Sequence, residues 1–100
     1  MAGVTYRSQA WSIYAGHGGW TGRHLGLREL EELDFIFFKF PKGLPRPMGI
    51  NHLGIAFGNP VTGEIELLHA SGSVGHVQIE PLMGRYLQHF FEGKRLTVGD

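Results

Sequence analysis

Two apolar segments joined by turn-forming residues place the strongest constraint on the fold of this chain. Residues 51–57 (NHLGIAF) and 64–70 (EIELLHA) have the length of strands and are rich in apolar side chains. Between them, residues 58–63 (GNPVTG) consist of residue types that favour turns. The pattern predicts an antiparallel β-hairpin with a histidine near the outer end of each strand.

Closing this hairpin symmetrically around Gly58–Gly63 would place His52 directly opposite His69. Opposed residues of an antiparallel pair share a face of the sheet, with Cβ atoms about 4.5–5.5 Å apart. The same face would carry the small residues Gly54 and Ala56, which leave space for a group to approach the rings. Two ordinary half-buried histidines at strand ends remain the alternative interpretation, because a one-residue slip of register would separate them.

The opposite face of the predicted hairpin would carry an apolar core. Its members are Leu53, Ile55, Phe57 and Leu68. The symmetric register also puts Glu66 opposite Ile55 on this face, and a β-bulge or an edge position would be needed to let the carboxylate reach water.

The rest of the chain divides into an irregular first third and a strand-rich remainder. Residues 1–33 predict a short helix capped by Ser8, then a glycine-rich loop and a helical turn. Residues 34–100 predict an antiparallel sheet, in which residues 81–91 form a short helix or an irregular crossover. Further strands are expected at residues 34–40, 76–79 and 95–98. The expected fold class is α+β: a small antiparallel sheet or half-barrel with one N-terminal helix.

Composition excludes several classes of function. One hundred residues correspond to one domain or part of one. Nine basic and nine acidic residues give a net charge of zero, which provides no positive surface for nucleic acid or an anionic membrane. No apolar stretch is long enough to span a bilayer, and the first residues lack the pattern of a signal peptide. The chain contains no cysteine, which excludes disulfides, thiolate zinc sites and a thiol nucleophile within it.

Six histidines raise the question of a metal site. The sequence has no HExxH motif, and no two histidines have the three- or four-residue spacing that puts both on one helix face. We therefore expect no metal and no cofactor. The alternative is a site in which His52 and His69 are joined by His17, His24 or His76.

Four sequence blocks in a fixed order point to a family. They are residues 35–40 (FIFFKF), 51–58 (NHLGIAFG), 67–82 (LLHASGSVGHVQIEPL) and 85–96 (RYLQHFFEGKRL). Together they resemble the C-terminal two-thirds of the NlpC-type cell-wall cysteine peptidases, and the likeness covers residues 5–98. In that family a Gly-Asp-Leu step precedes the first strand. Here Leu33-Asp34-Phe35 takes that place, with leucine instead of glycine.

Further motifs carry the resemblance at single residues. His52-Leu-Gly-Ile55 is similar to the family's His-Val-Gly-Ile pattern, and His69-Ala-Ser71 to its His-Ala-Ser pattern. Tyr86 takes the place of a closing tyrosine, and Lys94-Arg95-Leu96 that of a terminal strand with arginine. Upstream, the run YRSQAW resembles the family's Pro-Arg-Ser-x-x-Gln segment, which follows the catalytic helix.

The resemblance implies a papain-like fold, in which a helix bearing the catalytic cysteine packs on an antiparallel sheet bearing a histidine. By position, His52 would be the general base and His69 the residue that orients it. The family cleaves peptide bonds in bacterial cell-wall stem peptides, typically next to D-glutamate. Peptidoglycan stem peptide would therefore be the substrate, and the bacterial cell wall the site of action. Ser71 and Ser73 would contact that substrate, or would serve only as turn residues.

One departure from the family is severe. The family's Asp-Cys-Ser-Gly segment and its helix should precede YRSQAW, where only five residues stand. The nucleophile position is not occupied by any serine of the chain, namely Ser8, Ser12, Ser71 and Ser73. We therefore expect residues 1–100 to form an incomplete NlpC-type domain that is inactive alone. A cysteine-bearing partner chain would complete it, as in a split phage lysin or tail-associated hydrolase. Because the missing helix would leave apolar sheet surface exposed, we expect a partner chain or self-association to cover that surface.

Two other interpretations stay open. A catalytically dead relative would bind cell-wall peptide or a protein partner through the groove that survives. A homo-oligomeric structural module would instead use Trp11, Trp20 and the phenylalanine-rich strand as its interface.

Overall fold

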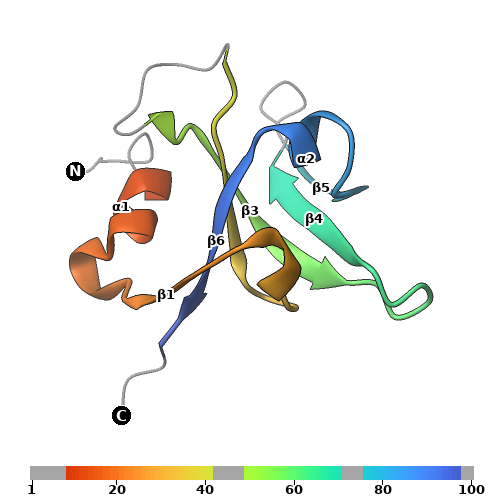
Figure 1. The fold of residues 1–100 in the computed structure, drawn as a ribbon, viewed down its shortest axis with the longest axis horizontal. Helices are drawn as coiled ribbons and strands as arrows, with labels where there is room; N and C mark the ends of the chain where they lie inside the picture. Colours follow the sequence, from red (N-terminus) through yellow and green to blue (C-terminus); the bar gives the residue numbers. More distant parts are fainter. Residues whose placement is uncertain (1–8, 42–48, 71–75, 98–100) are drawn as a thin grey trace.

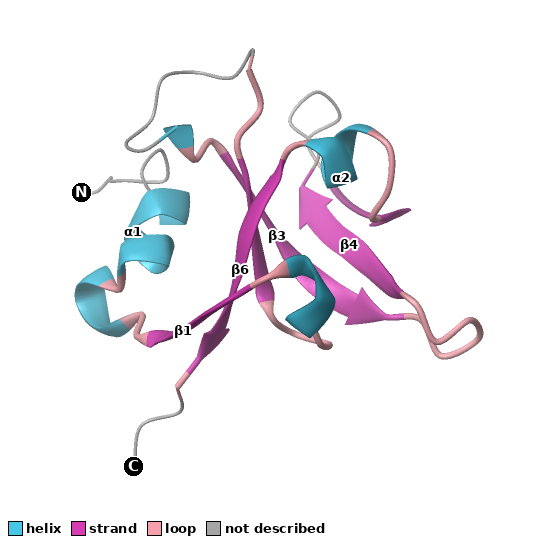
Figure 2. Ribbon diagram, in the orientation of Figure 1, coloured by secondary structure: helices cyan, strands magenta, loops and turns pink. Residues whose placement is uncertain are grey.

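The computed structural model describes residues 9–41, 49–70 and 76–97 of the chain (Figure 1). Within these residues the protein is a small α+β domain with a six-stranded antiparallel sheet and few helices, so the expected class is confirmed (Figure 2). The strands are β1 (Gly22–Leu25), β2 (Phe35–Phe38), β3 (His52–Gly58), β4 (Ile65–Ala70), β5 (Val77–Pro81) and β6 (Phe90–Leu96). The helical segments are α1 (Gln9–Ala15), the 3-10 turns η2 (His17–Gly19) and η3 (Leu27–Glu29), and α2 (Arg85–Gln88).

The strand order across the sheet is β1-β6-β2-β3-β4-β5, and every neighbouring pair is antiparallel. The first third of the chain differs from the expectation of helix and loop, because β1 pairs with β6 from Gly22↔Leu96 to Leu25↔Gly93. This pairing requires a glycine, since a Cβ on Gly22 would collide with the backbone carbonyl of Arg95. The last strand also begins at Phe90 rather than near Arg95, which gives β1 a partner along its length.

Alternate side chains divide the sheet into two faces, and the larger core lies on the face that carries His52 and His69. This surface is called the histidine face below. Six buried apolar residues form its core: Leu25, Leu30, Ile36, Phe38, Ala56 and Leu67. The sequence predicts the core on the other face, with Leu53, Ile55, Phe57 and Leu68. Those four are only partly buried, because that face is incompletely covered.

The opposite face, called the helix face, is covered by α1 over β2 and β6. Ile13 of α1 forms a second buried cluster with Phe37 and Ile50. Figure 1 shows α1 beside this part of the sheet and away from β4 and β5. Lys94 of β6 fastens the helix, because its Nζ atom donates to the carbonyl oxygens of Ile13 at 2.7 Å and Tyr14 at 3.1 Å. The buried ammonium complements the negative end of the helix dipole, and burial lowers the pKa of Lys94.

Leu53 of β3 packs against the Ile13 cluster, but the helix face beyond it, over β4 and β5, remains uncovered within the described residues. A shallow hollow of about 240 Å³ lies there, lined mainly by apolar side chains, and its backbone floor includes Gly54. At the edge strand, Val77 and Ile79 are 64% and 51% exposed. This half of the face is therefore apolar surface that a further segment or molecule could bury. Among the described residues, no helix is long and apolar enough to cross a membrane.

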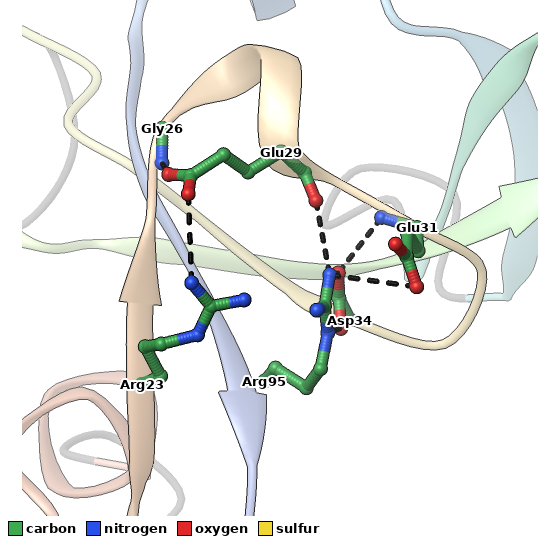
Figure 3. A network of polar contacts seen from close by, with 6 residues as sticks. All are labelled: Arg23, Gly26, Glu29, Glu31, Asp34 and Arg95. Atoms are coloured by element: carbon green, nitrogen blue, oxygen red, sulfur yellow. Dashed lines mark hydrogen bonds and ion pairs between the residues drawn. The ribbon is translucent and has the colours of Figure 1, made fainter.

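An ion pair between a buried carboxylate and a partly exposed guanidinium joins the start of β2 to β6. Asp34 is 3% exposed, and its two carboxylate oxygens accept hydrogen bonds from Nε and Nη2 of Arg95, each at 2.9 Å. Figure 3 shows this pair with Glu29 and Glu31 placed around the guanidinium. The Glu29 carbonyl accepts from Nη2 at 2.9 Å, and the Glu31 amide donates to Asp34 at 2.7 Å. The hydrogen bonds that Arg95 donates to Asp34 raise the pKa of Arg95. We call this arrangement the aspartate clasp.

The residue before the clasp adopts a backbone conformation that side chains disfavour. Leu33 has a φ of 76°, and it is the one residue other than glycine with a positive φ in the described part of the chain. Its side chain is 75% exposed, so burial does not compensate for the strain. This is the position at which the NlpC-type pattern has glycine, the residue that adopts such a φ without a steric penalty.

Candidate functional site

The β3–β4 hairpin brings the two histidines together in a register that differs from the predicted one. Ile55 pairs with Leu68 and Phe57 pairs with Glu66, so the strands are offset by two residues from the symmetric arrangement. The turn explains the offset. The side-chain oxygen of Asn59 accepts the amide of Val61 at 2.8 Å, and the backbone amide of Asn59 donates to the Glu64 carbonyl at 2.9 Å.

An offset of two residues keeps every side chain on its predicted face, because side chains alternate with a period of two. His52 and His69 are therefore diagonal neighbours on the histidine face rather than an opposed pair. Nε2 of His52 lies 2.7 Å from Nδ1 of His69, and the ring centroids are 4.9 Å apart. The predicted contact between the imidazoles is confirmed, although the predicted register is wrong.

Two residues that sequence reasoning missed extend the pair into a chain of polar groups. Glu80 of β5 lies on the histidine face beside β4, and its Oε2 atom is 2.7 Å from Nε2 of His69. Tyr86 of α2 donates its hydroxyl proton to the same oxygen at 3.2 Å. In the sequence, Tyr86 stands out only as the closing tyrosine of the NlpC-type pattern. We call the connected residues Glu80, His69 and His52 the histidine relay.

The relay determines where each proton resides when both rings are neutral. An ionised carboxylate only accepts, so Nε2 of His69 donates to Glu80. The other nitrogen of His69, Nδ1, then accepts the Nε2 proton of His52. The remaining nitrogen of His52, Nδ1, keeps its lone pair, and no hydrogen bond to it is found within the described residues. The arrangement therefore ends in an unprotonated nitrogen that can accept a proton.

The surroundings keep His52 neutral at pH 7. Burial, and then the charges of His69 and Arg85, lower the pKa of His52 from its ordinary value to about 4, against a smaller raising effect of Glu80. At the other end of the relay, the hydrogen bond from His69 lowers the pKa of Glu80, so this carboxylate is ionised. Burial also raises the pKa of Tyr86, which retains its proton as a donor to Glu80.

Packing fixes the ring positions. His69 is 5% exposed, and the backbone opposite it is Gly54, where a Cβ would collide with a methyl group of Leu67 and lie 3.4 Å from the His69 Cβ. The side-chain amide of Asn51, just before β3, links this strand to the backbone of Phe40. Its oxygen accepts from the Phe40 amide at 2.9 Å, and its nitrogen donates to the Phe40 carbonyl at 2.7 Å. The His52 ring consequently rests beside Phe40, with centroids 5.6 Å apart.

The described residues do not supply a nucleophile for this base. The chain has no cysteine, and Ser12 lies on α1, which packs on the helix face. The other sequence candidates, namely Ser8, Ser71 and Ser73, lie outside the described residues. Among residues 9–41, 49–70 and 76–97, no group of three or more metal-ligating side chains is arranged to hold an ion.

Comparison of the chain with protein-family models, with curated proteins and with solved structures found no match in any of the three. The geometry of the relay and the sequence resemblance therefore carry the functional argument that follows.

Proposed function

We propose that this chain is the histidine-bearing part of an NlpC-type cysteine peptidase with a papain-like fold, acting on peptidoglycan stem peptides. His52 is the general base, His69 orients it, and Glu80 holds His69 in the required tautomer. The observation that carries the proposal is the 2.7 Å contact between Nε2 of His52 and Nδ1 of His69, which leaves the other His52 nitrogen free. The nucleophile comes from outside these 100 residues, because they contain no cysteine.

The proposed reaction begins when Nδ1 of His52 accepts the proton of a cysteine thiol on the partner. The thiolate sulfur then bonds to the carbonyl carbon of the peptide. As the carbon–nitrogen bond breaks, His52 returns the proton to the leaving amine. Water, deprotonated by the same nitrogen, hydrolyses the thioester and restores the thiol. A neutral His52 suits the first step, because only the neutral ring accepts a proton.

Two features support a second polypeptide. Gly54 leaves room for the His69 ring, and Glu80 and Tyr86 complete the hydrogen bonds of the relay. Two histidines that met by chance at the surface would not need this supporting packing and hydrogen bonding. In addition, the uncovered half of the helix face presents exposed Val77 and Ile79 beside an apolar hollow, and association would remove this surface from water.

The test uses the protein in the assembly that forms in its natural source. Native mass spectrometry should find the 11.1 kDa chain bound to a cysteine-bearing polypeptide. This assembly should release new amino groups from purified peptidoglycan, and alkylation of the cysteine should abolish the release. An assembly with His52→Gln should lose at least about 100-fold in rate, the lower bound for a missing general base.

The matched control is His76→Gln, since His76 is exposed and outside the relay. It should leave the rate unchanged. The proposal is contradicted if the 100-residue chain hydrolyses peptidoglycan alone, or if the native assembly contains no cysteine and no activity. Saturable binding of stem peptides without hydrolysis by that cysteine-free assembly would instead identify a binding module.

A further inference from the structure

A second hollow lies beside the relay and is not used by the proposed proton transfer. Its volume is about 270 Å³, and Phe40, Pro41, Arg85 and His89 line it. The Phe40 ring forms a shared wall, because its centroid is 5.6 Å from that of His52 and 5.5 Å from that of His89. A molecule in this hollow would therefore contact the Phe40 ring that also packs against the ring of the proposed base.

Among the described residues, the lining of this hollow includes one arginine, Arg85, whose donors have no hydrogen-bond partner. Cζ of Arg85 lies 4.9 Å from the Phe40 ring centroid and 5.3 Å from that of Tyr86. In the described part of the chain, the Arg85 side chain makes no hydrogen bond and no ion pair. The nearest carboxylate of the relay, Glu80, already accepts from His69 and Tyr86. The aromatic contacts thus hold the guanidinium in place and leave its N–H groups available.

We infer that the hollow formed by Phe40, Pro41, Arg85 and His89 is a carboxylate-binding subsite, in which Arg85 recognises an anionic group of a peptide ligand. The inference rests on the proposed function for the location of the reacting bond, and it adds the residue that selects the ligand. The carboxylate is either the C-terminus of the peptide or an acidic side chain.

Three properties favour a carboxylate over other anions. A guanidinium presents paired N–H donors that match the two oxygens of a carboxylate. Phe40 and Pro41 provide an apolar surface for the carbon atoms next to the charge. A phosphate-rich polymer would require a cluster of cations, whereas the chain has no net charge and this hollow contains one arginine.

The experiment is an NMR titration of the 100-residue chain with three probes. The first is acetyl-alanyl-alanine with a free C-terminal carboxylate, and the second is its C-terminal amide. The third is acetyl-alanyl-glutamate with an amidated C-terminus, which carries the carboxylate on its side chain. The observed signals are the Nε–H group of Arg85 and the ring protons of His89. Arg85→Gln removes the charge, and Arg28→Gln is the control, because Arg28 is an exposed arginine on η3.

At least one carboxylate probe should shift both signals saturably, and the tighter of the two identifies the source of the carboxylate. Arg85→Gln should weaken that binding by about tenfold or more, the scale expected for a charge-assisted pair, while Arg28→Gln leaves it unchanged. Equal binding of the uncharged amide, or full affinity in Arg85→Gln, would overturn the inference. The titration needs no nucleophile and no bond cleavage. Its failure is therefore distinguishable from a failure of the proposed hydrolysis.

Discussion

The aspartate clasp and the histidine relay lie at opposite ends of β2. Both join a carboxylate to nitrogen donors, but they differ in whether a polar atom is left without a hydrogen bond. At the start of the strand, the Asp34 carboxylate accepts two bonds from Arg95, and Arg95 also donates to the Glu29 carbonyl. At the far end, opposite Phe38, the relay runs from Glu80 through His69 to His52. Both oxygens of the buried Asp34 carboxylate accept hydrogen bonds, whereas Nδ1 of His52, at the end of the relay, has no hydrogen-bond partner among the described residues.

The difference separates a structural network from one that is suited to chemistry. A buried carboxylate whose two oxygens both accept hydrogen bonds restrains the chain, and its oxygens are closed to a ligand. The relay has a buried middle, an ionised carboxylate at one end and a free proton acceptor at the other. The predictions below test whether the two networks divide these roles as described.

The largest effect is expected at the clasp. Asp34→Ala removes a buried carboxylate that accepts two bonds from a guanidinium and one from the Glu31 amide, and it should lower the free energy of unfolding by about 2–3 kcal/mol. Arg23→Ala is the control, because its ion pair with Glu29 is exposed and 3.6 Å long. It should cost below about 0.5 kcal/mol. Urea denaturation measures both, and equal losses would contradict the assignment of the clasp as the structural network.

The next effect tests how backbone packing holds the relay. Gly54→Ala introduces a Cβ against Leu67 and His69, and should cost about 2 kcal/mol because the buried strand cannot relax freely. Gly58→Ala lies on the same strand and face, and its Cβ would make ordinary 3.5 Å contact with Glu32. That variant should change stability by less than about 0.5 kcal/mol. Thermal denaturation of the two variants measures both losses of stability. Equal losses in Gly54→Ala and Gly58→Ala would contradict this account.

A smaller effect should appear as pH dependence. The folded protein has a His52 pKa of about 4, below the ordinary value of 6.5, so the unfolded chain binds more protons between these values. Stability should therefore be retained above pH 6.5 and fall by about 1–2 kcal/mol as the pH drops to 4, a value reduced for the partial exposure of the ring. Burial makes the largest contribution to this lowered pKa; the charged groups that face the ring are His69 and Arg85, which lower the pKa, and Glu80, which raises it.

The pKa of Glu80 is lowered from its ordinary value of 4.5, so this carboxylate also makes the folded protein less stable as the pH falls. Its contribution is lost below pH 4.5, whereas that of His52 is lost between pH 6.5 and 4. His52→Gln should consequently flatten the stability curve between pH 6.5 and 4 and leave the loss at lower pH. His76→Gln serves as the control and should keep the slope of the wild-type protein. Urea midpoints collected across this pH range give the answer, and an unchanged slope in His52→Gln would count against a neutral His52.

The smallest effect concerns the turn that leads into the clasp. Leu33→Gly should raise the free energy of unfolding by about 0.5–1 kcal/mol, because glycine adopts a φ of 76° without strain and the leucine side chain is mostly exposed. Leu33→Val should have the opposite sign, since β-branched residues tolerate positive φ poorly. Lower stability in Leu33→Gly would show that the leucine makes a contribution that outweighs its backbone strain.

The hairpin shows what the sequence could determine. Alternation of side chains fixed the face of His52 and His69, and a register error of two residues left that prediction intact. The register itself depends on how Asn59 organises the turn, and turn residues alone do not specify which pair of residues begins it. The same alternation could not show which face would be covered, because cover depends on where α1 and η3 lie.

Glu80 and Arg85 show what the sequence could not determine. Glu80 joins the relay only because β5 pairs with β4 in a register that puts it diagonal to His69. Arg85 reaches the Phe40 ring only because α2 follows β5 across the histidine face. Both contacts span chain segments whose relative position is set by the whole sheet. The alternating pattern of residues 77–81 was the one available signal for Glu80, since it predicts a half-buried strand.

The most direct test of the account is the protonation of the His52 ring, observed by long-range ¹H–¹⁵N NMR at pH 7. We expect a neutral ring with its proton on Nε2, a bare Nδ1, and a His69 ring that carries its proton on Nε2. Glu80→Gln is a useful companion, because it should loosen this tautomer preference in His69. A His52 ring that is doubly protonated at pH 7, or that carries its proton on Nδ1, would contradict the claim that the relay ends in a free base.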